Sequence, residues 1–226
     1  MLTAPRIPEL AQRDRFVRRT VKEGRVLTLA DEESASVPSQ KFAGRIVQLF
    51  WSSPLEAKRW AEALTGDASL QDISLETFAA DILPGLAAAK GLAGTDWVAD
   101  PIEAEVDPGD LLLRLKTESV PRFLKTLADR GEVFLVSDDN GPLVQKLSRR
   151  GGDVEALTVF ATRSEAERHS KKTGGKKVVR DPFADFLGST VPWAVTRGLA
   201  ILLEPISGAG PVDVRASDFQ ARLAAA

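Results

Sequence analysis

The sequence contains no cysteine. This absence excludes disulfides, thiolate metal sites and cysteine nucleophiles, and it fits a reducing compartment. His169 is the only histidine, so one chain cannot form a cluster of histidine metal ligands or pair two histidines for acid–base chemistry. The Gly-x-Ser-x-Gly motif of serine hydrolases is also missing. No catalytic constellation is therefore recognisable, and we expect His169 to be structural or exposed to solvent.

Long apolar runs are missing as well. The run at residues 82–89 is interrupted by Pro84 and falls short of the ~20 residues that cross a bilayer. Residues 1–19 interleave arginines with acids and lack the apolar stretch of a secretory signal. We therefore predict a cytoplasmic protein with an uncleaved N-terminus and no membrane span.

The composition is that of an ordinary soluble globular protein, with 43% hydrophobic and 27% charged residues. The net charge of −2 conceals a difference between the halves of the chain. Residues 1–118 hold 14 basic and 19 acidic residues, a net charge of −5, whereas residues 119–226 hold 16 and 13, a net charge of +3. Opposite charge favours docking of the halves on each other or partners of different sign, although drift between related copies is the simpler explanation.

The two halves share collinear anchors. Offsets of 107 to 109 residues relate pairs in the same order along the chain: Arg15-Phe16 and Arg122-Phe123, Gly24 and Gly131, Trp51 and Phe160, Glu56 and Glu165, Phe78 and Phe186, Pro84 and Pro192, Asp110 and Asp218. A shared helical period can align single segments by chance, but it does not produce an ordered series at nearly constant spacing. We infer two diverged tandem copies, residues 1–118 and 119–226, which we expect to pack on each other.

Each copy predicts the same elements. A helix ends at Gly24 or Gly131, a strand then runs into an acidic hairpin turn, and a second strand leads to a helix capped by Ser53 or Thr162. The predicted ranges are 7–23 and 120–130 for the first helix, 25–30 and 132–137 for the first strand, 45–51 and 156–161 for the second strand, 74–82 and 182–190 for a helix ending at Pro84 or Pro192, and 108–115 and 216–225 for the last helix. Strands and helices without strict alternation indicate an α+β fold with a mostly antiparallel sheet.

One family shares features with the first copy. Its segments Phe50-Trp51-Ser-Ser-Pro-Leu-Glu-Ala, Ile73-Ser-Leu-Glu-Thr-Phe78 and Leu83-Pro84-Gly85-Leu86 resemble the bacterial domain-of-unknown-function 2750 family over about residues 12–116. The second copy keeps Phe186 and Pro192 but replaces the leading segment, and its Thr158-Val159-Phe160 and Leu202-Leu203-Glu204-Pro205 are similar to the SseB family. These resemblances imply a small α+β domain and favour protein partners, including immunity-like ones, by analogy of fold.

Basic residues gather in the second copy. Residues 171–177 hold Lys171, Lys172, Lys176 and Lys177 but fail the phosphate-loop pattern G-x-x-x-x-G-K-[ST]. With Arg149 and Arg150 they form either a solvated loop or a basic patch for an acidic protein face. Nucleic acid is an unlikely partner because no aromatic residue lies among the lysines. Asp138 and Asp139 precede Asn140-Gly141, which predicts a hairpin turn rather than a metal site.

Tryptophans provide the remaining candidates for a binding surface. Trp51 aligns with Phe160, which predicts a place in the core, whereas Trp60 aligns with His169 and Trp97 follows the loop-like Gly94-Thr95-Asp96. Tryptophan is enriched among residues that dominate interface energies. Trp60 and Trp97 are therefore the predicted surface anchors.

Taken together, these patterns favour an uncharacterised, non-catalytic protein-interaction module, of immunity-like or regulatory type, without a metal or cofactor. The alternative is a small-ligand-binding protein or enzyme that uses carboxylates and arginines. Its candidates are Asp110 and Arg114, which recur as Asp218 and Arg222. Their spacing of four residues more simply predicts an ion pair along one helix.

Overall fold

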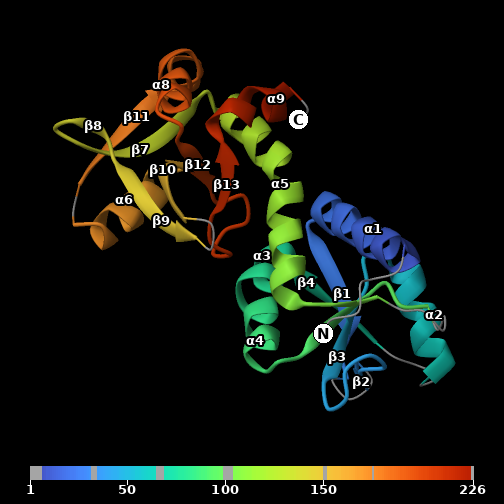
Figure 1. The fold of residues 1–226 in the computed structure, drawn as a ribbon. Helices are drawn as coiled ribbons and strands as arrows, with labels where there is room; N and C mark the ends of the chain where they lie inside the picture. The colour runs from blue at the N-terminus through green and yellow to red at the C-terminus, as the bar shows by residue number, and fades with distance from the viewer. Residues whose placement is uncertain are drawn as a thin grey trace. The chain divides into compact units, whose positions relative to one another are not determined.

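The structure is a computed structural model that describes residues 7–31, 35–64, 69–98, 104–149, 152–174 and 176–224. The chain divides into two compact units: residues 1–118 with 206–209, and residues 119–205 with 210–226. Each unit combines helices with a mostly antiparallel sheet (Figure 1), so the predicted α+β class is confirmed. None of the helices in the described ranges is long and apolar enough to cross a membrane.

The first unit begins with helix α1 (Ile7–Glu23) and strand β1 (Arg25–Leu29), as the sequence predicts. Gly24 between them has a φ of 71°, a left-handed conformation that glycine adopts without strain at the end of a helix. Its carbonyl accepts a hydrogen bond from the N–H of Leu75 at 2.9 Å. The turn that ends α1 therefore also positions a later helix of the unit.

The predicted hairpin after β1 is wrong. β1 pairs antiparallel with β4 (Leu70–Ser74), and Leu27 forms an isolated bridge with Trp51 on its other side. Because β4 and Trp51 occupy the two edges of β1, no edge is left for a hairpin partner. The predicted acidic turn lies largely outside the described residues.

The remaining strands of the first unit are β2 (Ser36–Pro38), β3 (Ile46–Phe50), β5 (Leu92–Thr95) and β6 (Glu105–Val106). They lie in the order β2-β3-β5-β6, and only β3 and β5 are parallel among these pairs. The bridge from Trp51 to Leu27 connects the end of β3 to β1. β3 and β5 therefore carry their carboxyl ends to the same edge of the sheet.

Helices cover both faces of this sheet. α1, the start of the long helix α5 (Pro108–Arg130) and the helical segment at residues 75–88 contribute to one core cluster around Phe16, Phe50 and Phe78. α2 (Pro54–Leu64) contributes to the other cluster, which holds Trp51 and Trp60. Alternation along β1 and β3 sends successive side chains to the two clusters, as the two-residue period of a strand requires.

The helical segment at residues 75–88 does not end at Pro84 as predicted. It consists of α3 (Leu75–Thr77), the π-helix η1 (Phe78–Ile82) and α4 (Leu83–Ala88). Pro84 lies in the first turn of α4, where a missing backbone N–H costs least. The wider turn of η1 before it lets the chain continue as a helix, since a π-turn shifts the hydrogen-bond register by one residue.

Helix α5 also differs from the prediction. The sequence analysis predicts one helix over residues 108–115 and another over residues 120–130, but α5 runs unbroken through both. Residues 116–120 contain neither glycine nor proline, and Pro121 follows them inside the helix. The division into units falls inside this helix, between Glu118 and Ser119.

The second unit contains one larger sheet in the order β11-β7-β10-β12-β13, with β8 paired to β7 and β9 paired to β10. Its strands are β7 (Glu132–Asp138), β8 (Gly141–Pro142), β9 (Val144–Arg149), β10 (Gly152–Phe160), β11 (Lys177–Pro182), β12 (Ala200–Leu203) and β13 (Val212–Arg215). β10 and β12 are parallel, and the other pairs are antiparallel. The predicted hairpin turn at Asp138 is confirmed, because its Oδ1 accepts the Asn140 N–H at 2.8 Å between β7 and β8.

Helices cover this sheet as well. The C-terminal half of α5 and the later helices contribute to the large cluster around Phe186 and Phe219, whereas α6 (Arg163–Lys172) packs with Phe134 and Phe160. The later helical elements are α7 (Phe183–Asp185), the π-helix η2 (Phe186–Thr190), α8 (Val191–Thr196), the 3₁₀ turn η3 (Ala216–Asp218) and α9 (Phe219–Ala224). Pro192 lies in the first turn of α8 and does not end the helix as predicted.

Candidate functional site

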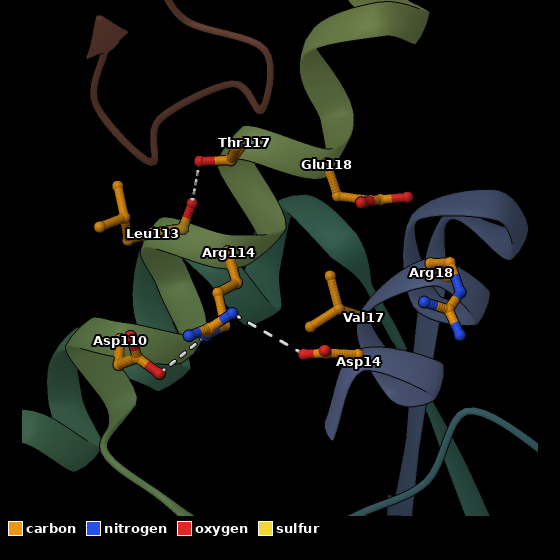
Figure 2. Close-up of a pocket in the computed structure, with 8 residues that line it drawn as sticks. All are labelled: Asp14, Val17, Arg18, Asp110, Leu113, Arg114, Thr117 and Glu118. Carbon is orange, nitrogen blue, oxygen red and sulfur yellow. Dashed lines mark hydrogen bonds and ion pairs between the residues drawn. The ribbon is translucent and has the colours of Figure 1, made fainter. Parts of the chain in front are cut away.

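A groove opens between α1 and α5 in the first unit (Figure 2). Its volume is about 410 Å³. It is lined from α1 by Asp14, Val17 and Arg18, and from α5 by Asp110, Leu113, Arg114, Thr117 and Glu118. Five of these eight side chains are charged, and they project from two facing helix surfaces.

An ion-pair network closes one end of the groove. Arg114 Nε donates to Asp110 Oδ2 at 2.9 Å, which confirms the ion pair predicted from their spacing. Arg114 also lies 3.7 Å from Asp14 on the facing helix, as the dashed line in Figure 2 shows. Arg13, which is 11% exposed, contacts both Asp14 at 2.9 Å and Asp110 at 3.6 Å. Two arginines and two aspartates therefore neutralise each other across the two helices.

The other end of the groove carries charges without such partners. Among the described contacts, neither Arg18 on α1 nor Glu118 on α5 forms an ion pair or a hydrogen bond. Leu113 is 52% exposed, and the Thr117 hydroxyl donates to the Leu113 carbonyl at 2.8 Å. Val17 is buried at the floor. One cation, one anion and an apolar side chain therefore remain available to a bound molecule.

The prediction that Trp60 and Trp97 lie on the surface is wrong. Trp97 is 2% exposed and Trp60 is 8% exposed, and both belong to the cluster beneath α2. Their rings lie 5.8 Å apart, and the Trp97 indole N–H donates to the Ala104 carbonyl at 2.8 Å. The residues before Trp97 look like a loop in the sequence, but Gly94 and Thr95 belong to β5. Trp97, just after this strand, packs beneath α2. Packing therefore accounts for both residues.

The lysines of the predicted basic patch are exposed. Lys171 and Lys172 end α6, Lys177 begins β11, and Lys176 lies 4.0 Å from Asp138. Cations in the last turn of a helix also stabilise its dipole. Arg149 ends β9, whereas Arg150 lies outside the described residues. The four lysines thus lie at the end of α6 and around the start of β11, and no described contact of theirs identifies a binding partner.

His169 is half-buried on α6. Its Nε2 lies 2.6 Å from the amide of Gln145, which also reaches the hydroxyl of Thr158 at 3.3 Å. Burial, followed by the charge of Lys172, lowers the pKa of His169. Within the described ranges, no group of three or more histidines and carboxylates could hold a metal ion.

The sequence analysis missed a buried carboxylate at the end of β5. Asp96 is fully buried and has a φ of 52°, in the left-handed region that aspartate tolerates better than most residues. Its carboxylate accepts the Ser52 N–H at 2.6 Å and the Ser52 hydroxyl at 2.8 Å, just before α2 begins. Burial raises the pKa of Asp96 to about 6, against these hydrogen bonds. A single aspartate after a glycine and a threonine gave no sequence signal of this burial.

Comparison with known proteins bears on the first unit. Residues 13–115 match one family model. The family is described as "Protein of unknown function (DUF2750)", and the match supports the relationship that the sequence analysis expected for the first half of the chain. It spans a little under half of the chain and includes every residue that lines the groove except Thr117 and Glu118.

A search of curated proteins found no match. Two solved structures are similar over much of their length. Tic22 from Plasmodium falciparum is 8% identical, covers 75% of this chain and 84% of its own, and has a TM-score of 0.24. A Tic22 from Anabaena, described with protein transport, is 12% identical, covers 84% and 87%, and has a TM-score of 0.22. Scores this low support no argument about the fold or function of this chain.

Proposed function

We propose that this chain is a non-catalytic protein-binding module and that a segment of its partner lies in the groove between α1 and α5. The observation that carries the proposal is the charge arrangement of the groove walls. Arg18 and Glu118 lack partners among the described contacts, beside the exposed Leu113. A protein segment with an acidic, a basic and an apolar side chain complements these groups.

The composition of the lining favours a protein segment over a small molecule. Small-molecule pockets are lined mainly by apolar and aromatic side chains, with few polar groups. This groove is lined mainly by charged side chains and contains no aromatic one. Protein interfaces commonly place charges around a central apolar contact, and Leu113 with Val17 provides that contact here.

A small-ligand site is the second candidate function. Asp110 and Arg114, the carboxylate and arginine named from the sequence, do line the groove. Its volume of about 410 Å³ falls within the range of small-molecule sites. An enzyme or small-molecule binder would therefore use this same surface.

Site-specific photo-crosslinking tests the proposal. A photoreactive residue is placed at Thr117 in the groove or, as a matched control, at Thr77, an exposed threonine on α3 of the same unit. We expect one protein to crosslink from Thr117 and not from Thr77, through a contiguous segment that mass spectrometry identifies. A synthetic peptide of that segment should then bind the purified chain. Equal crosslinking from both positions, or a peptide that fails to bind, would contradict the proposal.

We also propose that the two units descend from one duplicated domain. Matching backbone contacts support this origin. Gly24 O accepts from Leu75 N at 2.9 Å, and Gly131 O accepts from Phe183 N at 2.9 Å, with φ values of 71° and 70° at the two glycines. The pairs Ser36↔Gln48 and Val144↔Leu157, Leu27↔Trp51 and Phe134↔Phe160, and Ala93↔Val106 and Ile201↔Val214 recur at the offsets read from the sequence.

The proposed duplication bears on function because the two copies present different charged surfaces. The second unit has the basic patch of Lys171, Lys172, Lys176 and Lys177, whereas its own Asp218 and Arg222 lie on η3 and α9. We propose that the copies diverged to contact different parts of a cytoplasmic partner. To test whether the two copies contact different parts of the partner, residues 119–226 are expressed separately and their binding to the partner is measured.

A further inference from the structure

A second polar cluster lies at the other side of α1, away from the groove residues. It is built where β3 and β5 end side by side, the only parallel strands among the described pairs of the first unit. The segments after the two strands are joined by the indole N–H of Trp51, which donates to the Trp97 carbonyl at 2.8 Å. Ligand sites in sheets with parallel strands commonly lie outside the carboxyl ends of those strands.

Arg15 of α1 reaches this edge but is not satisfied there. Its Nε is buried and has no hydrogen-bond partner. Asp96 Oδ2 lies 3.9 Å from this Nε, and Glu56 Oε1 lies 3.7 Å from Arg15 Nη2, and both distances are too long for a hydrogen bond. Buried donors in native structures are almost always paired. The Nε of Arg15 therefore needs an acceptor, and no described residue provides one.

A second guanidinium lies one helical turn along. Arg19 contacts the Glu56 carboxylate at 3.3 and 3.4 Å and is 45% exposed. Glu56 is therefore shared between two arginines, and the charges of Arg15, Arg19, Glu56 and Asp96 sum to zero when both acids are ionised. Each arginine keeps donors that face solvent, because its side chain is more than 40% exposed.

We propose that Arg15, with Arg19 beside it, binds an oxyanion, either a carboxylate or a phosphate group, at the carboxyl ends of β3 and β5. The planar guanidinium matches two oxygens of such a group, and one of them would give the buried Nε its acceptor. The site shares no residue with the groove lining, so the inference stands independently of the proposed function.

The protonation state of Asp96 changes the net charge of this site. It faces Arg15 from α1 and Glu56 from α2, and its own carboxylate competes with an incoming anion for Arg15. Protonation of Asp96, whose pKa is raised to about 6, leaves Arg15, Arg19 and Glu56 with one net positive charge. Anion binding therefore strengthens as the pH falls through that value.

The Arg15 Nε–H resonance, followed by NMR, reports directly on the proposed contact. The probes are succinate and inorganic phosphate, each titrated at constant ionic strength against chloride. We expect a saturable shift of this resonance, with whichever probe binds more tightly identifying the class of oxyanion. Absence of a saturable shift with both probes would overturn the proposal.

Conservative variants separate a specific contact from general charge attraction. Arg15→Lys keeps the charge but removes the Nε donor, and should lower the affinity about tenfold, the value of one charge-assisted hydrogen bond. Arg59→Lys, on the exposed face of α2, should leave the affinity unchanged. Equal affinities of wild type and Arg15→Lys would reduce the effect to an adventitious ion only.

A pH series provides the second readout. Sulfate is the probe for this series, because phosphate and succinate themselves take up protons in this range whereas sulfate stays doubly charged. The affinity of the wild type for sulfate should be higher at about pH 5 than at about pH 7.5, and Asp96→Asn should remove that difference. The asparagine oxygen can still accept from Ser52, so the start of α2 keeps its anchor. A pH dependence that persists in Asp96→Asn would show that Asp96 is not the coupled group.

Discussion

The sheet face beneath α2 and the sheet face beneath α6 carry different kinds of side chain. Beneath α2, Trp51, Trp60 and Trp97 form a cluster of indole rings at 5.8 and 6.3 Å. Beneath α6, Phe160 packs against His169, which contacts the amide of Gln145. His169 stands at the place that the sequence repeat assigns to Trp60. The face beneath the helix therefore holds an apolar core in one unit and a polar contact in the other.

This contrast shows what alignment of related segments can and cannot predict. The proposed repeat aligns Trp60 with His169, but this alignment does not predict how exposed each side chain is. Trp60 is 8% exposed because the larger ring extends into the space between α2 and the sheet, whereas His169 stays half-buried. The burial of a side chain therefore cannot be predicted from the residue with which it is aligned.

The largest expected effect is the loss of a tryptophan beneath α2. Trp60→Ala should destabilise the first unit by about 3–5 kcal/mol, since it removes a large buried ring and leaves a cavity. His169→Ala should destabilise the second unit by only about 1 kcal/mol, the value of a typical hydrogen bond. Denaturant unfolding, followed unit by unit by hydrogen exchange, measures both. Equal costs would contradict the difference between the two faces.

The two units should respond to pH with opposite sign. The pKa of Asp96 is about 6 in the folded chain against 3.8 for the free side chain, so the folded first unit binds this proton more tightly than the unfolded chain. Its stability therefore falls as the pH rises from about 4 to about 6, by at most about 3 kcal/mol, and is constant above. The pKa of His169 is lowered, so the stability of the second unit rises with pH until the unfolded histidine, near 6.5, is neutral.

Matched variants isolate these two slopes in a hydrogen-exchange series over pH. Asp96→Asn should flatten the profile of the first unit and leave that of the second unit unchanged. His169→Gln should do the reverse. A first unit that gains stability between about pH 4 and about pH 6 would contradict the burial of an ionisable Asp96.

A smaller effect distinguishes the starts of α2 and α6. Thr162 caps α6 in a capping box with Glu165, whereas the start of α2 is held through Ser52 by Asp96. Thr162→Ala should therefore cost about 1 kcal/mol. Ser53→Ala should cost less than about 0.5 kcal/mol, because the Ser53 side chain forms none of the described hydrogen bonds. Thermal unfolding of both variants compares them, and a larger loss from Ser53→Ala would reverse the expected order.

The smallest effect concerns the last pair of the repeat. Asp110→Asn should destabilise the first unit by about 0.2–0.5 kcal/mol, since Asp110 and Arg114 form a partly exposed pair along α5. Asp218→Asn should cost less, because Asp218 lies on η3, before α9, and no described ion pair joins it to Arg222. Unfolding in low and high salt separates the two, since only the first loss should shrink with added salt.

Local patterns predicted much of the fold. The bounds of α1, the glycines that end two helices, the Thr162 cap and the Asp110–Arg114 pair all follow from residues close together in the sequence. Long-range pairing did not follow. In place of the hairpin expected after β1, this strand pairs with β4, more than 40 residues later, and with Trp51 on its other edge. The unbroken α5 was missed because the repeat itself suggested a boundary there.

The candidate sites depend on the same kind of long-range contact. The groove joins residues near position 14 to residues near position 114, and only the pair within α5 had a sequence signal. Asp96 and Arg15 are likewise far apart in the chain, and neither stands in a recognisable motif. The sequence could name the arginine and carboxylate types but not which of them the fold brings together.

Charge reversal on the groove walls tests the central claim most directly. The peptide identified by crosslinking from Thr117 is titrated by calorimetry into wild type, Arg18→Glu, Glu118→Lys and, as a control, Lys58→Glu on the exposed face of α2. The account predicts that each groove variant weakens binding by about tenfold while Lys58→Glu changes it little, since only groove charges face the peptide. An affinity that changes alike in Arg18→Glu and Lys58→Glu and in the opposite direction in Glu118→Lys would show that the peptide binds through net charge, and that the groove is not its site.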